Sequence, residues 1–428
     1  MVREGTGTRV PPRSYDPGMA TTAGWRPLKP PSTAKVAGPF ARLARTHALL
    51  SAGDTLVALA LAGSLFFSIT PDAARAKVAL YLLLTMAPFS VIAPLIGPWI
   101  DRKEGGRRSM ILLSGGGRAV LCVLMIDDLN SVLLFPEALA VLVLGKAYNI
   151  ARSSLVPGLV RDESELVQAN SKLVLITGIV GFLVAGPGVG LLQLGAGWVL
   201  GLAAAFFAVG TITAVRIPAT RVSGPRSGPE QDAGLRGAGI LLAASAMAAL
   251  RGIVGFLAFH LAFNLRGDGA PTWWFGVVLA TSAVGSLLGA AAAPALRRVV
   301  REERVLLGCV VGVAVAALAS VKLDPRPSAA VLACAVGVAA SAGKLCFDAI
   351  VQRDAPDANQ GRSFARFETR FQLAWVIGAV IPVAVVVPLD AGYIGIAVVA
   401  AVAAVLYLTR RHLPLRQLSA VFGPRRSK

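Results

Sequence analysis

The amino-acid sequence predicts an all-α membrane protein with twelve transmembrane helices, arranged as two pseudo-symmetric six-helix bundles with both termini in the cytoplasm. Three observations predict it: the composition, the repeated apolar blocks and the distribution of basic residues. Of the 428 residues, 55% are hydrophobic and only 15% are charged, whereas soluble proteins carry about 25% charged residues. The apolar residues gather in blocks of roughly 20, which is enough for a helix to cross the hydrocarbon core of a bilayer.

Charged, proline and glycine breaks separate the apolar blocks into twelve predicted spans. They are 48–70, 78–100, 109–127, 131–151, 169–193 and 196–215, followed by 238–264, 272–296, 305–321, 328–350, 367–388 and 391–409. The longest connection between spans is rich in Gly, Pro, Arg and Ser and divides them into two sets of six. We therefore expect an N-terminal bundle at 47–215, a cytoplasmic linker at 216–237 and a C-terminal bundle at 238–409.

Polar, basic segments flank the two bundles. Residues 1–46 contain many Pro and Arg residues but no apolar run, so we expect a disordered, basic cytoplasmic leader and no signal peptide. Either Met1 or Met19 suits the start of translation. Residues 410–428 are expected to form a basic cytoplasmic tail.

The distribution of basic residues predicts the orientation. With a cytoplasmic N-terminus, 32 of the 42 Lys and Arg residues lie in cytoplasmic segments and only five in outer loops. Basic residues favour the cytoplasmic side of membrane proteins, so both termini are expected inside. The same asymmetry explains the net charge of +19 without nucleic acid as a partner. The composition, rich in Ala, Gly, Val and Arg, favours the plasma (inner) membrane of a bacterium.

The two halves of the chain share a short motif. GKAYNIA at 145–151, in the fourth span, aligns with GKLCFDA at 343–349, in the tenth, at an offset of 198 residues. Each Gly-Lys pair lies near the cytoplasmic end of its span. Duplicated six-helix halves joined by a cytoplasmic linker are a recurring design of membrane transporters.

A motif rich in glycine and arginine follows the second span. It reads GPWIDRKEGGRR, from Gly97 to Arg108, and resembles the signature Gly-x₃-Asp-Arg-x-Gly-Arg-Arg of the major facilitator superfamily, with Glu104 and Gly105 as two extra residues. In that family the cluster latches the two halves in one state and releases them in the other. The resemblance implies the major facilitator fold and a gating motif made of Gly97, Asp101, Arg102, Arg107 and Arg108.

A second motif, AGPGVG at 185–190, lies in the fifth span. It resembles the Gly-Pro-x₂-Gly core of the signature that marks antiporters in the superfamily, carried here by Gly186, Pro187 and Gly190. The upstream Gly181 is one place away from the family's spacing. Close packing of helices through small residues explains the motif equally well, so both interpretations stay open.

Further segments resemble one bacterial subgroup of the superfamily. Gly53-Asp54 in the first span and LVRDESELVQANSKL after the fourth are similar to exporters of the enterobactin-exporter type, while Lys146 takes the place of an Arg that the family often carries in the fourth span. The C-terminal counterpart of the first signature, around Leu296-Arg297-Arg298, lacks its Asp. The resemblance implies a monomeric, proton-coupled drug antiporter that exports a small organic molecule by alternating access.

Six charged residues inside the predicted spans are candidates for proton coupling or for the central cavity. They are Asp54, Arg118, Lys146, Arg251, Lys344 and Asp348. Because a charge at the centre of a membrane helix costs about 2.5–3.5 kcal/mol, each needs a partner, a cavity or a function.

Spacing and depth suggest partners for some of these charges. Asp54 and Lys146 lie at similar depth and are candidates for a pair, either structural or involved in coupling. Lys344 and Asp348, spaced i, i+4, share a helix face. Arg251 then seeks an acceptor, either Asp348 or an anionic substrate, and the sequence assigns no partner to Arg118. An excess of basic groups in the cavity favours an anionic or zwitterionic substrate, whereas an unpaired Asp54 favours a cation.

Sequence motifs for other functions are absent. The sequence contains no GxxxxGK[ST] loop for nucleotides, and its three His residues show no metal-ligand spacing. We therefore expect no enzymatic activity, no cofactor and no metal site, with a small molecule, protons and the lipid bilayer as partners. A facilitator or importer of the same fold, and a transporter-like sensor or assembly protein that does not transport, stay open as alternatives.

Overall fold

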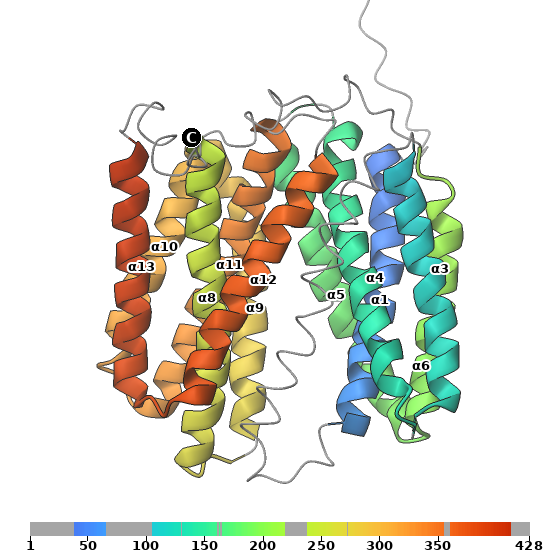
Figure 1. Cartoon of the computed structure of the whole chain (residues 1–428), viewed down its shortest axis with the longest axis horizontal. Helices are drawn as coiled ribbons and strands as arrows, with labels where there is room; N and C mark the ends of the chain where they lie inside the picture. The colour runs from blue at the N-terminus through green and yellow to red at the C-terminus, as the bar shows by residue number, and fades with distance from the viewer. Residues whose placement is uncertain are drawn as a thin grey trace, which may run out of the picture. The chain divides into compact units, whose positions relative to one another are not determined.

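The computed structural model describes residues 38–65, 105–129, 131–160, 162, 165–218, 238–271, 273–354 and 360–411. Every regular element within these residues is a helix (Figure 1). The contact pattern separates residues 1–37 from residues 38–428, and the described helices belong to the second unit.

The N-terminal group of described helices comprises α1 (Pro39–Leu65), α3 (Gly106–Asp127), α4 (Leu134–Leu155), α5 (Leu166–Leu192) and α6 (Ala196–Ala214). A short 3₁₀ turn, η2 (Val156–Leu159), continues α4. Helix α1 packs against α5 and α6, and α3 packs against α4 and α6. The long apolar stretches of these helices bury Leu, Ala and Val side chains between them.

The C-terminal group comprises α8 (Ala238–Gly267), α9 (Trp273–Val299), α10 (Glu302–Ser320), α11 (Pro325–Asp354), α12 (Gln360–Ala384) and α13 (Leu389–Arg411). Helix α8 packs against α11, α12 and α13, while α11 packs against α9 and α10. The two groups meet where α5 contacts α9 and α11 and where α4 contacts α12.

The described helices agree with eleven of the twelve predicted spans, and the remaining span, 78–100, lies outside the described residues. Within the described part of the chain, nine helices are long and apolar enough to cross a membrane. The other two long helices, α1 and α12, both carry charged residues along their length. The all-α membrane fold is thus present, whereas the count of twelve spans and the orientation of the termini stay predictions.

Helix α1 begins at Pro39, inside the segment 1–46 that the sequence assigns to a leader. Proline suits the first turn of a helix, where its missing N–H would have no partner within the helix. Leu43 and Thr46 are fully buried, so packing holds this turn against the neighbouring helices. Helix α1 therefore begins before the predicted first span, 48–70, while the bounds of the bundle stay a prediction.

Helices α8 and α12 pack backbone against backbone. A Cβ atom at Gly255 would collide with the carbonyl oxygen of Trp375, and one at Gly378 would collide with the carbonyl oxygen of Gly252. Small residues allow membrane helices to approach this closely. The two helices therefore form a tightly packed pair.

Candidate functional site

A cavity of about 510 Å³ lies between the N-terminal and C-terminal groups of helices. Residues of α4 and α5 line it on one side, and residues of α8, α9, α11 and α12 line it on the other. Small-molecule sites in proteins occupy about 300–1,000 Å³, so the volume suits an organic molecule.

Helix α8 gives the cavity one charged residue and a long apolar wall. Arg251, Val254, Leu257, Ala258 and Leu261 line the cavity and recur every three or four residues, which places them on one helix face. At 1.5 Å per residue this face is about 15 Å long. Arg251 lies at one end of it, and the remainder is apolar.

Helix α11 likewise changes from apolar to charged residues along the cavity, but its charged residues lie towards its C-terminus. Its cavity-lining residues run from Ala333 and Val336 to Lys344 and Asp348. Lys344 pairs with Glu368 of α12, and Arg251 and Glu368 line the same cavity. The charged residues of these helices therefore gather at one end of the cavity, and the apolar residues line the rest.

We call Lys146, Arg251, Lys344, Asp348 and Glu368 the cavity charge cluster. Lys344 Nζ lies 2.5 Å from Asp348 Oδ1 and 3.6 Å from Glu368 Oε2, so the contact predicted from the i, i+4 spacing is present. Lys146 Nζ donates to Gln372 Oε1 of α12 at 3.5 Å, which connects the two groups of helices. Three basic side chains thus face two acidic ones.

No ion pair joins Arg251 to another residue of the described segments. Its Nε atom is buried and has no hydrogen-bond partner in that part of the chain. Asp348, one of the two acceptors expected for Arg251, pairs with Lys344 instead. The guanidinium of Arg251 therefore faces the cavity with hydrogen-bonding capacity to spare.

Asp54 pairs with Arg118, not with Lys146 as the sequence suggested. Arg118 Nη1 lies 2.5 Å from Asp54 Oδ1. The Arg118 side chain is fully buried while that of Asp54 is 48% exposed. Arg118 Nε also donates to the carbonyl oxygen of Ser114 at 3.0 Å, and its guanidinium lies 4.5 Å from the ring centre of Phe207. The similar depth of Asp54 and Lys146 in the predicted spans pointed to the wrong partner, because the packing of α1, α3 and α6 decides which charges meet.

The ion pair of Asp54 and Arg118 lies apart from the residues that line the cavity. Both side chains belong to the N-terminal group, on α1 and α3. Of the six predicted intramembrane charges, the cavity therefore brings together Lys146, Arg251, Lys344 and Asp348 and leaves these two out.

The predicted gating motif is described only in part. Gly97, Asp101 and Arg102 lie outside the described residues. Arg107 is buried in the first turn of α3, and Arg108 follows it on the same turn. Gly105, one of the two extra residues in the motif, precedes α3 with φ = +73°, a left-handed conformation that favours glycine. The extra glycine is therefore the residue at which the chain turns into α3.

The antiporter-like motif lies on α5, with Pro187 inside the helix. A Cβ atom at Gly186 or Gly190 would have no heavy atom within 4 Å, whereas one at Gly188 would lie 2.7 Å from a methyl group of Leu59 on α1. Close helix packing thus accounts for Gly188. It does not account for the two glycines that carry the resemblance.

Three side chains that the sequence did not single out join the two groups of helices. Gln352 Nε2 donates to the carbonyl oxygen of Ser153 at 2.8 Å, and Asn170 Nδ2 donates to Gln352 Oε1 at 2.7 Å. Ser171 Oγ donates to the carbonyl oxygen of Ala290 at 2.6 Å. We call these five residues the inter-bundle latch. Ser153 and Gln352 lie in the last turns of α4 and α11, Asn170 and Ser171 lie in the second turn of α5, and Ala290 lies nine residues before the end of α9.

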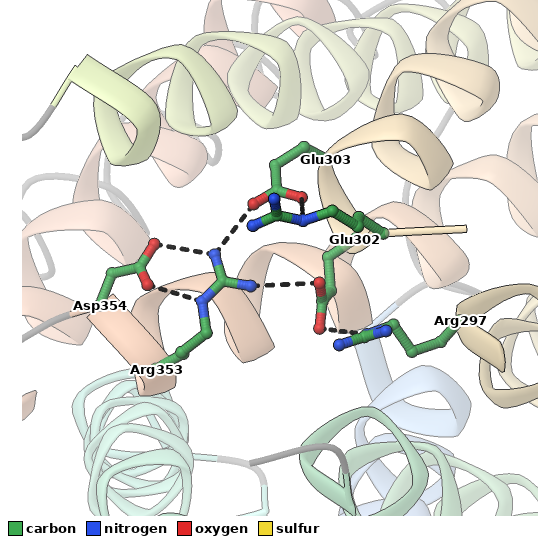
Figure 2. Close-up of polar contacts among 6 residues, drawn as sticks. Arg297, Glu302, Glu303, Arg353 and Asp354 are labelled. Atoms are coloured by element: carbon green, nitrogen blue, oxygen red, sulfur yellow. Dashed lines mark hydrogen bonds and ion pairs between the residues drawn. The ribbon is translucent and has the colours of Figure 1, made fainter. Parts of the chain in front are cut away.

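A network of charges ties the end of α11 to the start of α10 (Figure 2). Arg353 Nη1 lies 3.2 Å from Glu302 Oε2, and its Nη2 lies 2.9 Å from Glu303 Oε1. Arg297 also pairs with Glu302, and Asp354 accepts from Arg353 Nε at 2.6 Å. The C-terminal counterpart of the gating motif lacks its Asp in sequence, and here Glu302 supplies a carboxylate from the next helix.

A buried histidine network lies in the N-terminal group. His47 Nδ1 is 2.9 Å from the Tyr148 hydroxyl, and His47 Nε2 is 2.8 Å from Thr177 Oγ1 and 3.1 Å from Arg152 Nη1. The spacing of the histidines in the sequence excludes a metal-ligand motif but gives no signal for this network. Within the described residues, no group of three or more His, Cys, Asp or Glu side chains could hold a metal ion.

Comparison with known protein families gives one match over most of the chain. The sequence profile described as the Major Facilitator Superfamily matches residues 43–379. An uncharacterized protein of Mycobacterium leprae is 31% identical over 385 aligned residues, which cover 79% of this chain and 66% of the relative. An uncharacterized protein of Mycobacterium tuberculosis has the same identity and coverage of this chain, and 68% of its own length is covered. The chain thus spans about two thirds of these relatives.

Solved structures share the fold at low sequence identity. A bacterial homologue of the iron transporter ferroportin, in an outward-facing state, has a TM-score of 0.69 and 15% identity, covering 88% of this chain and 100% of that protein. The human organic anion transporter has a TM-score of 0.68 and 14% identity, covering 86% and 99%. A Major Facilitator Superfamily transporter in the outward conformation has a TM-score of 0.62 and 14% identity, covering 87% and 98%.

Proposed function

Because the chain belongs to the Major Facilitator Superfamily, we propose that it carries a small organic molecule across a membrane by alternating access. One observation carries this proposal: a cavity lined by both groups of helices, next to polar contacts that join the groups through the inter-bundle latch. A transporter that alternates access needs a site between two bodies and a contact that can open. The fold supports a transporter and not an enzyme.

We further propose twelve spans with both termini in the cytoplasm, in the plasma membrane, and a division at the linker 216–237. The 32 basic residues of the expected cytoplasmic segments support this orientation. In this orientation the inter-bundle latch lies on the cytoplasmic side, because the C-terminal halves of α4, α9 and α11 and the N-terminal half of α5 lie on that side. The conformation is then closed towards the cytoplasm, and the apolar end of the cavity faces outward.

For direction and coupling we propose export in exchange for protons, as in the enterobactin-exporter-like and drug:proton antiporter subgroup. Asp54 would take up the proton, and Gly186, Pro187 and Gly190 would form the antiporter-like helix. The pairing of Asp54 with the fully buried Arg118 supports this role. Protonating the carboxylate would leave a buried charge without its partner, which is strongly unfavourable. Proton uptake would therefore favour a rearrangement of α1 against α3.

A proteoliposome assay tests the proposal. The protein would be reconstituted into liposomes that hold a pH-sensitive dye in their lumen, and a pH gradient would be imposed across the liposome membrane. One of three probes would then be added: 3-phenylpropane-1-sulfonate, trimethyl(3-phenylpropyl)ammonium or the zwitterion phenylalanine. We expect proton flux that depends on one probe and is lost in Asp54→Asn. Probe movement without proton flux would indicate a facilitator. Movement of no probe by folded protein would favour the non-transporting alternative.

A reversible cross-link tests the alternating-access step. Cysteines at Ser153 and Gln352, joined by a short bis-methanethiosulfonate linker, should hold the latch closed and stop flux until the linker is reduced. A matched pair at Ser328 and Tyr393, whose hydroxyls lie 3.1 Å apart within the C-terminal group, should leave flux unchanged when linked. Full flux with the latch linked would contradict alternating access at this interface.

A further inference from the structure

We propose that the cavity binds an amphipathic organic anion, with its acidic head on Arg251 and its apolar body along α8 and α11. This inference names the substrate class of the proposed function and rests on it. It is carried by the unequal charges of the cluster and by the apolar wall beyond them.

The balance of charge at the polar end favours an anion. The three basic side chains of the cluster and Arg152 line the cavity, and the two acidic side chains of the cluster oppose them. Both acids are held by the same base: Lys344 lies 2.5 Å from Asp348 and 3.6 Å from Glu368. A cationic ligand would have to displace Lys344 from these carboxylates, whereas an anion adds a missing negative charge.

Arg251 offers the geometry that such an anion needs. Its guanidinium lines the cavity, makes no ion pair with another residue of the described segments and carries a buried Nε without a hydrogen-bond partner. A guanidinium presents a planar set of N–H donors that matches two oxygens of a carboxylate, sulfonate or phosphate group. Lys146, on the opposite group of helices, lines the same space and supplies a second positive charge.

The rest of the ligand should be apolar. Beyond Arg251, the α8 face continues through Val254, Leu257 and Leu261 for about 15 Å. On α11 the facing wall is made of Ala333 and Val336. Burying hydrocarbon against this wall is favourable, so an anion that carries an apolar body uses both ends of the cavity, while a small inorganic anion uses only one.

Thermal unfolding of the full chain in detergent, followed with increasing ligand, tests the assignment. The probes share one phenylpropyl body: 3-phenylpropane-1-sulfonate, trimethyl(3-phenylpropyl)ammonium and neutral 3-phenylpropan-1-ol, with phenylalanine as a zwitterion. The sulfonate should stabilise the wild type at the lowest concentration. In Arg251→Gln its half-saturating concentration should rise about tenfold or more, as expected when a charged hydrogen bond is lost.

Matched variants separate binding from folding. Arg266→Gln removes the same charge from the exposed end of α8 and should bind the sulfonate like the wild type. Arg251→Lys should keep part of the affinity, and Lys146→Gln gives a second measurement if Arg251→Gln fails to fold. Equal or tighter binding of the ammonium, the alcohol or phenylalanine would overturn the proposal, as would unchanged sulfonate binding in both Arg251→Gln and Lys146→Gln.

The experiments distinguish a failure of the proposed anion site from a failure of the proposed transport function. Sulfonate binding that depends on Arg251, without flux of any probe in proteoliposomes, would support the anion site and contradict the transport function. Flux of the ammonium probe that does not depend on Arg251 would support transport and contradict the anion site.

Discussion

Two sets of intramembrane charges in this chain are partnered in different ways. Asp54 and Arg118 come from two helices of one group and form a one-to-one pair at 2.5 Å. The cavity charge cluster draws on four helices from both groups, and its three basic side chains exceed its two acidic ones. The first set is electrically complete and the second is not. Charges that look alike in the sequence therefore differ in the structure: one set forms a complete pair within a bundle, and the other has more basic than acidic groups beside a cavity.

The largest effect is expected from Asp54→Asn. Arg118 would keep its charge in a fully buried position without a carboxylate, so the free energy of unfolding should fall by about 3 kcal/mol. Thermal or chemical unfolding in detergent would measure the loss. The double variant Asp54→Asn with Arg118→Met should recover much of it, since no buried charge remains. Wild-type stability of the single variant would contradict the structural side of the comparison.

The next effect concerns the inter-bundle latch. Gln352→Ala removes two hydrogen bonds that join the groups of helices, each worth about 1 kcal/mol. The closed state should lose population, and a cysteine placed at Ser341 in the cavity should react faster with an impermeant thiol reagent added from the cytoplasmic side. Gln193→Ala, at the far end of α5, is the matched control. Equal labelling rates in the two variants would show that the latch does not hold this end closed.

A smaller loss is expected from Asp348→Asn. Lys344 would keep Glu368 at 3.6 Å, so the free energy of unfolding should fall by only about 1 kcal/mol. Because the two carboxylates share one base, Asp348→Asn combined with Glu368→Gln should cost more than the sum of the single changes. Additive effects in the double-mutant cycle would indicate that the carboxylates act independently.

The smallest expected effect is the different salt dependence of the Asp54–Arg118 pair and the cavity charge cluster. Raising NaCl from about 0.1 M to about 1 M should weaken binding of the sulfonate probe a few-fold, because salt screens charges that water can reach. The stability cost of Asp54→Asn should change less, since one partner of that pair, Arg118, is fully buried. Equal salt dependence of both quantities would remove the distinction between them.

The sequence was a good guide to features that lie along one helix. The observed helix bounds follow the apolar blocks closely, and the Lys344–Asp348 contact follows from its i, i+4 spacing. Hydropathy and helical periodicity are local properties of the chain. The start of α1 was predicted too late because charged residues interrupt the apolar pattern there, although Leu43 is fully buried.

Features that depend on which helices meet were beyond the sequence. Depth in the membrane could not tell that Asp54 contacts Arg118 and not Lys146. Glu368 precedes most of the apolar part of its span, and only the packing of α12 brings it to Lys344. Gln352 and Asn170 are uncharged, so nothing in the sequence marked them as a contact between the two groups of helices.

The close backbone contact between α8 and α12 predicts that these two helices move together. At Gly252, Gly255 and Gly378 the two helices approach so closely that a Cβ atom at Gly255 or Gly378 would collide with the backbone of the other helix. Spin labels on these helices should report one constant distance in every state of the protein, while labels across α5 and α9 report whatever motion occurs. Arg251 and Glu368 lie on this same pair of helices, so in the proposed transport cycle we expect these two charges to keep a constant spacing.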